Sequence, residues 1–194
     1  MTVKKILTGR AHQMTITLHG IRPPIWRRVQ VPGAIRLAAL HEVIQTVFGW
    51  TDSHLHQFVV VGRTYGQPDD FDEAVEDESG VTLAQALGTR NKRFLYVYDF
   101  GDNWEHDVVV ENIVAGNTGS EGPLCLGGKR RRPPEDCGGP PGYQNFLEAV
   151  RDPGHEEHDA MLEWVGGSFD AEAFDLAAVN RALAAVSKAG GSVQ

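Results

Sequence analysis

The chain has 194 residues, of which 41% are hydrophobic and 23% charged, and this composition is typical of a globular protein of one domain. Its longest apolar runs are a few residues, far short of the roughly 18 that a membrane-spanning helix needs. No apolar segment near the start resembles a secretory signal, and two cysteines are too few for a disulfide scaffold. We therefore expect a protein of the cytoplasm, with a reducing environment and no membrane partner.

The charges are distributed unevenly along the chain. The net charge is −8, yet residues 1–50 carry seven lysines and arginines against Glu42 alone. Seven carboxylates lie in residues 67–80, and a basic run at 129–132 interrupts the acidic remainder. Because binding to phosphates needs clustered cations, an acidic protein is expected to bind nucleic acid weakly at best. The residues proposed for a contact with an anion are Arg22, Arg27 and Arg28, with a solvated surface of mixed charge as the simpler interpretation.

The first half of the chain alternates between patterns typical of strands and one pattern typical of a helix. Residues 13–19 and 25–31 alternate polar and apolar side chains, which predicts two strands. Residues 36–48 have apolar side chains at helical spacing, which predicts a helix. A strand is expected at 54–61 and a short one at 64–65. The apolar positions of the predicted helix are Leu37, Leu40, Val43, Ile44 and Val47.

The second half begins with the acidic stretch 67–80, which we expect to be a loop because it has almost no core residues. Residues 82–87 predict a short helix, with Thr82 as its N-cap. Residues 94–100 and 104–110 predict two strands, joined through Gly101-Asp102-Asn103 as a hairpin.

Beyond the hairpin the composition changes to glycine and proline. Residues 115–142 are expected to form a long loop that carries function or wraps the surface. Helices are expected at about 143–151, 156–165 and 176–187, the last with Asp175 as its N-cap.

This order of elements predicts an α+β fold: a β-grasp-like mixed or antiparallel sheet packed on a helix, with a long Gly/Pro loop and C-terminal helices. Hairpins rather than βαβ repeats dominate, which argues against a doubly wound sheet. We expect a single domain over residues 1–194. Its core spans about 12–185, with the long loop at 115–142 and a helical C-terminal part at 143–187.

Five motifs, in this order, give the chain a recognisable signature. They are GIRPPIWRR at 20–28 with LHEVIQ at 40–45, GWTDSHLHQF at 49–58, YDFGDNWEH at 98–106, PPEDCGGP at 133–140, and the segment from Phe169 to Asp175. With them the chain resembles the plasmid pRiA4b ORF-3-like family, also called MM3350-like, over about residues 12–185.

The resemblance implies an α+β fold and an association with plasmids and other mobile elements, since part of the family is labelled as a resolvase-like passenger of insertion elements. The residues do not support serine recombination, because Ser53, the only serine before Ser79, lies beside Asp52 rather than an arginine cluster. In one respect the chain departs from the family. Many relatives have a cysteine before the PPEDC string, where this chain has Arg132, and this weakens the case for a metal bound by three family cysteines.

Histidines and aspartates near the predicted hairpin form the most informative pattern. His54 and His56 are two residues apart, so an early start of their strand would place both on one face. Asp102, Trp104 and His106 alternate in the same way along the hairpin, and we expect Asp102 and His106 to lie near each other. Such a mixture could bind a metal through nitrogen and oxygen, or act as a general acid and base. The alternative is that these residues cap the turn and satisfy strand ends. The candidate site residues are His54, His56, Asp99, Asp102, Trp104, His106, Glu135 and Asp136.

The two cysteines suggest a zinc site with weaker support. Cys125 and Cys137 lie 12 residues apart and would need two further ligands, drawn from His54, His56 or His106. Two unconnected thiols are the simpler interpretation. Carboxylates beside Cys137 would raise the pKa of its thiol, which argues against a cysteine nucleophile.

Two hypotheses for function remain. Phosphate-binding loops, dinucleotide fingerprints, His-Glu-x-x-His motifs and nucleophile elbows are absent from the sequence. We therefore expect a non-catalytic binding or interaction module whose partner is another macromolecule. The alternative is a small hydrolase-type enzyme that uses the His/Asp hairpin site, with or without a divalent metal such as zinc as a cofactor.

Overall fold

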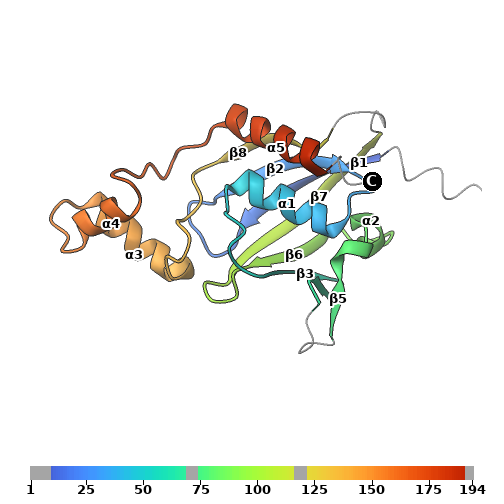
Figure 1. Cartoon of the computed structure of the whole chain (residues 1–194), viewed down its shortest axis with the longest axis horizontal. Helices are drawn as coiled ribbons and strands as arrows, with labels where there is room; N and C mark the ends of the chain where they lie inside the picture. Colours follow the sequence, from blue (N-terminus) through green and yellow to red (C-terminus); the bar gives the residue numbers. More distant parts are fainter. Residues whose placement is uncertain (1–9, 69–73, 116–121, 191–194) are drawn as a thin grey trace, which may run out of the picture.

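The computed structural model describes residues 10–68, 74–115 and 122–190, and it forms one sheet with helices on one face and at one end (Figure 1). Within these ranges, every helix is too short or too polar to span a bilayer. The strands are β1 (Arg10–Leu18), β2 (Trp26–Pro32), β3 (His56–Val60), β4 (Arg63–Gly66), β5 (Val75–Asp77), β6 (Arg93–Tyr98), β7 (Trp104–Ala115) and β8 (Leu124–Lys129). The helices are α1 (Leu37–Phe48), the 3₁₀ turn η1 (Glu78–Gly80), α2 (Leu83–Leu87), α3 (Gly139–Arg151), α4 (His158–Trp164) and α5 (Leu176–Gly190).

The sheet has eight strands in the order β5-β4-β3-β6-β7-β1-β2-β8. All neighbouring strands are antiparallel except β4 and β5, which run parallel. The α+β class and the mixed, mostly antiparallel sheet are thus confirmed. The sheet is larger than the β-grasp-like expectation, because β8 extends one edge and β5 the other.

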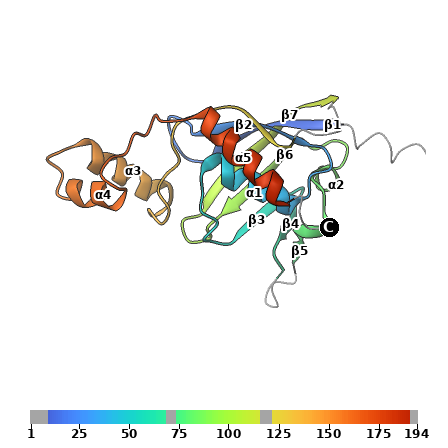
Figure 2. The same cartoon turned by 45° about the horizontal axis from the view of Figure 1, so that its top comes forward.

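Helix α1 packs its apolar side against the sheet, as the spacing of its side chains predicts. The five apolar positions named above are all buried, and Gly49 ends the helix in the left-handed conformation, with φ of 83°. Helices α1 and α5 lie on the same face of the sheet (Figures 1 and 2). On β1, Gln13 and Thr15 are not part of the core and donate hydrogen bonds to the Glu111 carboxylate of β7, so this part of the sheet is polar.

Both predicted N-caps are confirmed. The Thr82 hydroxyl accepts a hydrogen bond from the Gln85 backbone N–H, and Oε1 of Gln85 accepts one from the Thr82 backbone N–H, a complete capping box for α2. The Asp175 carboxylate accepts a hydrogen bond from the Ala178 amide at 2.9 Å at the start of α5.

The two predicted loops contain regular structure. Residues 115–142, of which 116–121 lie outside the described residues, are not one long loop, because β8 pairs with β2 within them and α3 already begins at Gly139. The acidic stretch 67–80 includes β5 and η1, while its residues 69–73 lie outside the described residues. Both strands are added at the sheet edges. β8 pairs with β2, which is far away in the sequence, whereas β5 pairs in parallel with the nearby β4, and local composition reveals neither pairing.

A side-chain amide lies along the outer edge of β8. The Asn180 side chain, from α5, accepts a hydrogen bond from the Cys125 N–H at 2.8 Å and donates one to the Cys125 carbonyl oxygen at 2.9 Å. The amide therefore satisfies both backbone groups that Cys125 would otherwise offer to a further strand.

Helices α3 and α4 form a lobe beyond the end of the sheet (Figures 1 and 2). Phe146 of α3 meets the rings of Trp164 and Phe169 edge to face, with centroids 5.8 and 4.9 Å apart. Two segments, 130–138 and 165–175, connect this lobe to the sheet.

Arg27 of β2 holds the sheet, α1 and the C-terminal segment together from inside the core. Its side chain is buried, and its N–H groups donate hydrogen bonds of 2.8 to 3.0 Å to four carbonyl oxygens, those of Trp26, Val47, Lys129 and Arg130. The rings of Phe48 and Phe174 lie 5.0 and 4.5 Å from the guanidinium carbon. Burial lowers the pKa of Arg27 to about 10, which still leaves the group charged at neutral pH.

Arg27→Lys should destabilise the protein although it keeps the charge. A single ammonium group cannot replace a planar fork of donors, so several buried carbonyl groups lose their partners, at a cost of about 2–4 kcal/mol. Urea unfolding measures this free energy. The control is Arg28→Lys, because the neighbouring Arg28 is partly exposed and pairs with Glu111, and we expect a change within about 0.5 kcal/mol. Equal losses in the two variants would contradict the role of Arg27.

Candidate functional site

Three loops meet at one end of the sheet. Residues 49–55 join α1 to β3, residues 99–103 join β6 to β7, and residues 130–138 join β8 to α3. The start of β3, the end of β6 and the start of β7 lie at the same end because these neighbouring strands are antiparallel. This arrangement brings together candidate residues from distant parts of the chain.

His54, Asp99 and Asp136, one from each loop, form the centre of this site. The Nε2 atom of His54 lies 3.0 Å from Oδ1 of Asp136 and 3.7 Å from Oδ2 of Asp99. One ligand atom from each residue lies within 4.8 Å of the other two. The structure thus groups three of the eight candidate residues, and we call them the His54 cluster.

The aspartates of this region have an uncommon backbone conformation. Asp52, Asp99 and Asp136 all have positive φ, at 54°, 58° and 53°. Aspartate tolerates the left-handed region better than most residues, and such conformations gather at functional sites. The backbone amides of Gly101 and Asp102 both donate to Oδ1 of Asp99, which leaves Oδ2 directed at His54.

Asp102 and Glu135 help to hold the three loops in place. Oδ2 of Asp102 accepts a hydrogen bond from the Gly138 amide at 3.1 Å. A side chain at Gly139 would place its Cβ 2.5 Å from the Asp102 carbonyl oxygen, so only glycine allows α3 to begin against the hairpin loop. Oε1 of Glu135 accepts hydrogen bonds from the backbone N–H and the hydroxyl of Thr51.

His56 does not join His54, because β3 begins at His56 and His54 precedes it in the loop. Nε2 of His56 lies 3.0 Å from the Glu78 carboxylate, and its ring stacks on that of His41, with centroids 3.5 Å apart and an interplanar angle of 11°. Nε2 of His41 lies 2.9 Å from Oδ1 of Asp52. Burial, and then the proximity of His56, lower the pKa of His41. These four residues form a second group, the His41 cluster.

His106 and Trp104 lie in the core rather than in the site. The Trp50 indole N–H donates to Nε2 of His106 at 3.2 Å, so the proton must be on Nδ1, which lies 2.9 Å from the Trp104 carbonyl oxygen. Both ring nitrogens of His106 are therefore occupied. Its partners do not include Asp102, which we expected nearby and which bonds to Gly138 instead.

The cysteines lie apart from both clusters. Cys125 and Cys137 are free thiols, and neither belongs to the groups of potential metal ligands found among the described residues. Burial, and then the charge of Asp102, raise the pKa of Cys137 to about 12, so its thiol stays protonated at neutral pH. This agrees with the sequence-based argument against a cysteine nucleophile.

The basic residues proposed for anion binding are largely used within the fold. The expected anion contact at Arg27 is corrected, because its guanidinium is buried and bonded to carbonyl oxygens. Arg28 pairs with Glu111, and Arg22 is exposed. In the basic run, Arg130 is buried against Pro23 and Glu172, while Arg131 and Arg132 lie over the rings of Phe169 and Trp50.

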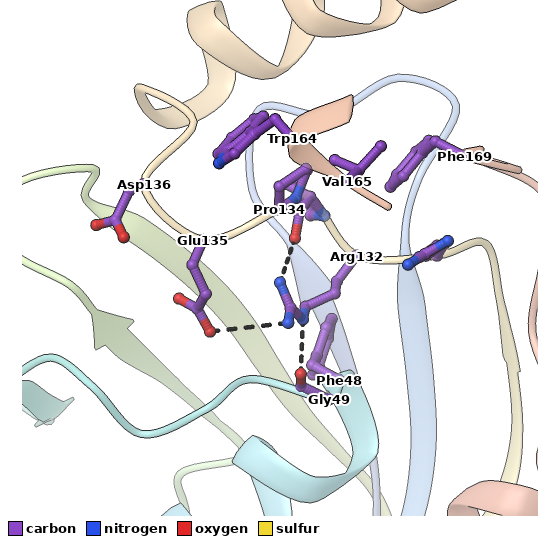
Figure 3. A pocket seen from close by; sticks show the side chains of 11 residues that line it. Phe48, Gly49, Arg132, Pro134, Glu135, Asp136, Trp164, Val165 and Phe169 are labelled. Carbon is purple, nitrogen blue, oxygen red and sulfur yellow. Dashed lines mark hydrogen bonds and ion pairs between the residues drawn. The ribbon is translucent and has the colours of Figure 1, made fainter. Parts of the chain in front are cut away.

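A cleft adjoins the His54 cluster between the sheet and the α3–α4 lobe. Its first hollow, of about 490 Å³, has Trp164, Val165 and Phe169 on one wall and Phe48 and Arg132 on the other (Figure 3). A second hollow, of about 320 Å³, lies along α3 and α4. Asp136 and Trp164 line both hollows, so the cluster and the cleft share a residue.

Sequence reasoning missed several residues of this region. His41 is a histidine on the apolar face of a helix, a recognisable but ambiguous signal. Glu78 lies in a stretch interpreted as a loop, and Trp164 lies on a helix whose packing depends on residues outside it. Local sequence carries no signal that would place Trp164 beside Asp136.

Comparisons with known proteins agree on one family. The family profile "Plasmid pRiA4b ORF-3-like protein" matches residues 10–178. An uncharacterized protein, y4hQ of Sinorhizobium fredii, is 43% identical over 174 residues, which cover 88% of this chain and 89% of that protein. The crystal structure of MM3350, a protein of unknown function from Methanosarcina mazei, has a TM-score of 0.80 and 38% identity. The match covers 87% of this chain and 96% of that one.

His106 should make the stability of the protein depend on pH. Burial lowers its pKa to about 4, below the ordinary value of 6.5. The unfolded chain therefore binds a proton more readily, and the stabilisation is complete above about pH 6.5 and is lost as the pH falls toward 4, by up to about 3 kcal/mol.

The measurement is urea unfolding of the wild type and of His106→Gln at several pH values between 7.5 and 4. The glutamine amide does not titrate in this range, so the stability of the variant should fall less steeply with pH. Parallel pH profiles for the two proteins would show that His106 is not buried in its neutral form.

Proposed function

We propose that this chain, which belongs to the plasmid pRiA4b ORF-3-like family, is a binding module that takes up a segment of another polypeptide in its cleft. The observation that carries this proposal is the position of Trp164, which is 49% exposed where the two hollows meet. Tryptophan and arginine are the residues that most often dominate the energy of protein–protein interfaces. Here Trp164 lies across the first hollow from Arg132, which belongs to the loop between β8 and α3 (Figure 3).

The division of the cleft favours a polypeptide over a small molecule. A small-molecule site is a single concavity that encloses most of its ligand. Here an exposed indole separates two adjoining hollows. Alternate side chains of an extended segment point in opposite directions, so two of them could enter the hollows on either side of Trp164.

The chemistry of the walls suggests the character of this segment. Val165 and Phe169 offer apolar surface beside Trp164. The Arg131 guanidinium lies 4.7 Å from the centre of the Phe169 ring and has no ion-pair partner among the described residues. Arg132, by contrast, is held by the carbonyl oxygens of Gly49 and Pro133. We therefore expect a segment with apolar side chains followed by a carboxylate that reaches Arg131.

A small hydrolase is the second candidate, because His54 lies close to two carboxylates beside the cleft. Paired His and Asp side chains are typical of general acid–base catalysis. Hydrolysis of model esters or phosphoesters that is lost in His54→Ala but kept in Trp164→Ala would favour this candidate. A binding module is expected to hydrolyse none of them.

The binding proposal is tested with peptides selected from a random display library on the wild-type protein. Titration calorimetry of the selected peptides should show that Trp164→Ala weakens binding by at least about tenfold, because a central tryptophan contributes about 2 kcal/mol or more to such interfaces. The matched control is Ile113→Ala on β7, which truncates a side chain that is similarly exposed, at 50%, outside the cleft. This variant should bind as the wild type does.

Two outcomes would contradict the proposal. One is that no peptide is enriched in the selection on folded protein. The other is that the enriched peptides bind Trp164→Ala and the wild type equally well, which would place their site elsewhere on the surface.

A further inference from the structure

We propose that His54, Asp99 and Asp136 bind a divalent metal ion, with Zn²⁺ as the expected occupant. This inference does not depend on what enters the cleft, and it would supply a metal that the hydrolase candidate could use. One imidazole and two carboxylates offer mixed nitrogen and oxygen ligands of the kind that Zn²⁺ accepts.

The spacing of the three ligand atoms fits a single ion. In a tetrahedral zinc site with bonds of about 2.0–2.2 Å, neighbouring ligand atoms lie about 3.4 Å apart. The distances from Nε2 of His54 to the carboxylate oxygens are 3.0 Å for Asp136 and 3.7 Å for Asp99, one on each side of that value. All three ligand atoms lie within 4.8 Å of one another, so small shifts of the side chains would bring them around one ion.

An unsatisfied atom provides a second, independent reason. Nε2 of His54 is buried, and it makes no hydrogen bond among the described residues, although the Asp136 oxygen lies close to it. The distance is suitable for a hydrogen bond, so the alignment must be poor. A buried polar nitrogen without a hydrogen-bond partner destabilises the fold, and coordination of a metal would remove this cost.

The backbone around the ligands is held by interactions within the protein itself. Asp99 is buried, and its Oδ1 atom already accepts two amide hydrogen bonds, which fix the carboxylate and leave Oδ2 for coordination. Asp99 and Asp136 keep left-handed backbone conformations that cost free energy in most residues. Ligands held in this way lose little freedom on binding.

The surrounding charges favour a cation. Glu135 and Asp102 are the immediate neighbours of Asp136 and Asp99, and Oε2 of Glu135 is buried with no hydrogen-bond partner among the described residues. Among the described residues, the cation paired with this group is Arg132, whose guanidinium lies 3.9 Å from the other Glu135 oxygen. One arginine does not balance four carboxylates, so the negative charge is in excess here.

The His41 cluster is the alternative metal site, and its geometry opposes one. Imidazole lone pairs lie in the ring plane, and the rings of His41 and His56 are stacked almost in parallel. Nearly parallel planes do not meet within coordination distance, so the two rings cannot share an ion. Both nitrogens of His41 also have partners already, in Tyr96 and Asp52.

Three protein ligands would leave at least one coordination position for water or a ligand. Structural zinc sites use four protein ligands, whereas sites that act on a ligand keep a position open. Asp136 lines both hollows, so an open position at this ion would lie beside the cleft. A carboxylate or another oxygen donor is the group that such a position would bind.

The experiment is titration of metal-free protein, purified without a metal-affinity tag, with ZnCl₂ in a calorimeter. We expect one ion per chain. Asp136→Asn and His54→Ala should each weaken binding by at least about 100-fold, since even residues that only orient metal ligands contribute 10–100-fold. Circular dichroism verifies that both variants are folded, and Asp136 is an exposed residue whose substitution leaves the core intact.

Three controls locate the ion. Asp107→Asn alters a similar His–Asp pair elsewhere, in which Nδ1 of His19 lies 2.9 Å from the Asp107 carboxylate. Asp52→Asn alters the His41 cluster, and Trp164→Ala alters the cleft. All three should bind Zn²⁺ as the wild type does, so the metal site and the peptide cleft can fail separately.

The proposal is overturned if the wild type binds no Zn²⁺ in this titration, or if folded Asp136→Asn and His54→Ala bind it as tightly as the wild type. It is also overturned if Asp52→Asn abolishes binding while Asp136→Asn does not, because the ion would then lie in the His41 cluster.

Discussion

The buried guanidinium of Arg27 is the contact on which the relative position of two of the three loops depends. By bonding to the carbonyl oxygens of Val47 and Arg130, it holds the end of α1 against the end of β8. The chain that leaves α1 leads to His54, and the chain that leaves β8 leads to Asp136. An interaction inside the core thus fixes the points from which these two segments of the surface site begin.

Local patterns in the sequence were sufficient for elements that are stabilised by their own residues. The apolar spacing of α1 and the cap at Thr82 predicted two helices that the structure confirms. Local patterns were not sufficient for β8. Its sequence contains two glycines, and its strand conformation comes from pairing with β2. A short edge strand depends on a partner that is about 100 residues away, and local composition does not record that partner.

The same limit applies to the site. The sequence predicted that His54, Asp99 and Asp136 belong to a site, and the structure groups them, although the role of the site stays a prediction. The expectation that His54 and His56 share a face depended on where β3 begins. Asp52, with its positive φ, lies in the loop that precedes β3, and the strand begins only at His56. His54 therefore lies in the loop and His56 in the strand, and their side chains belong to different clusters. His106 alternates with Trp104 as predicted, but the face they share is the core.

The Asn180 amide at the edge of β8 has a consequence for how copies of the chain behave at high concentration. Exposed edge strands offer unpaired N–H and C=O groups, which allow sheets of different molecules to join and aggregate. By occupying both groups of Cys125, the side chain of α5 removes a pairing position that an incoming strand would need. At the opposite edge, β5 has only three residues and offers little to pair with. Both edges of the sheet therefore disfavour pairing with the sheet of another molecule.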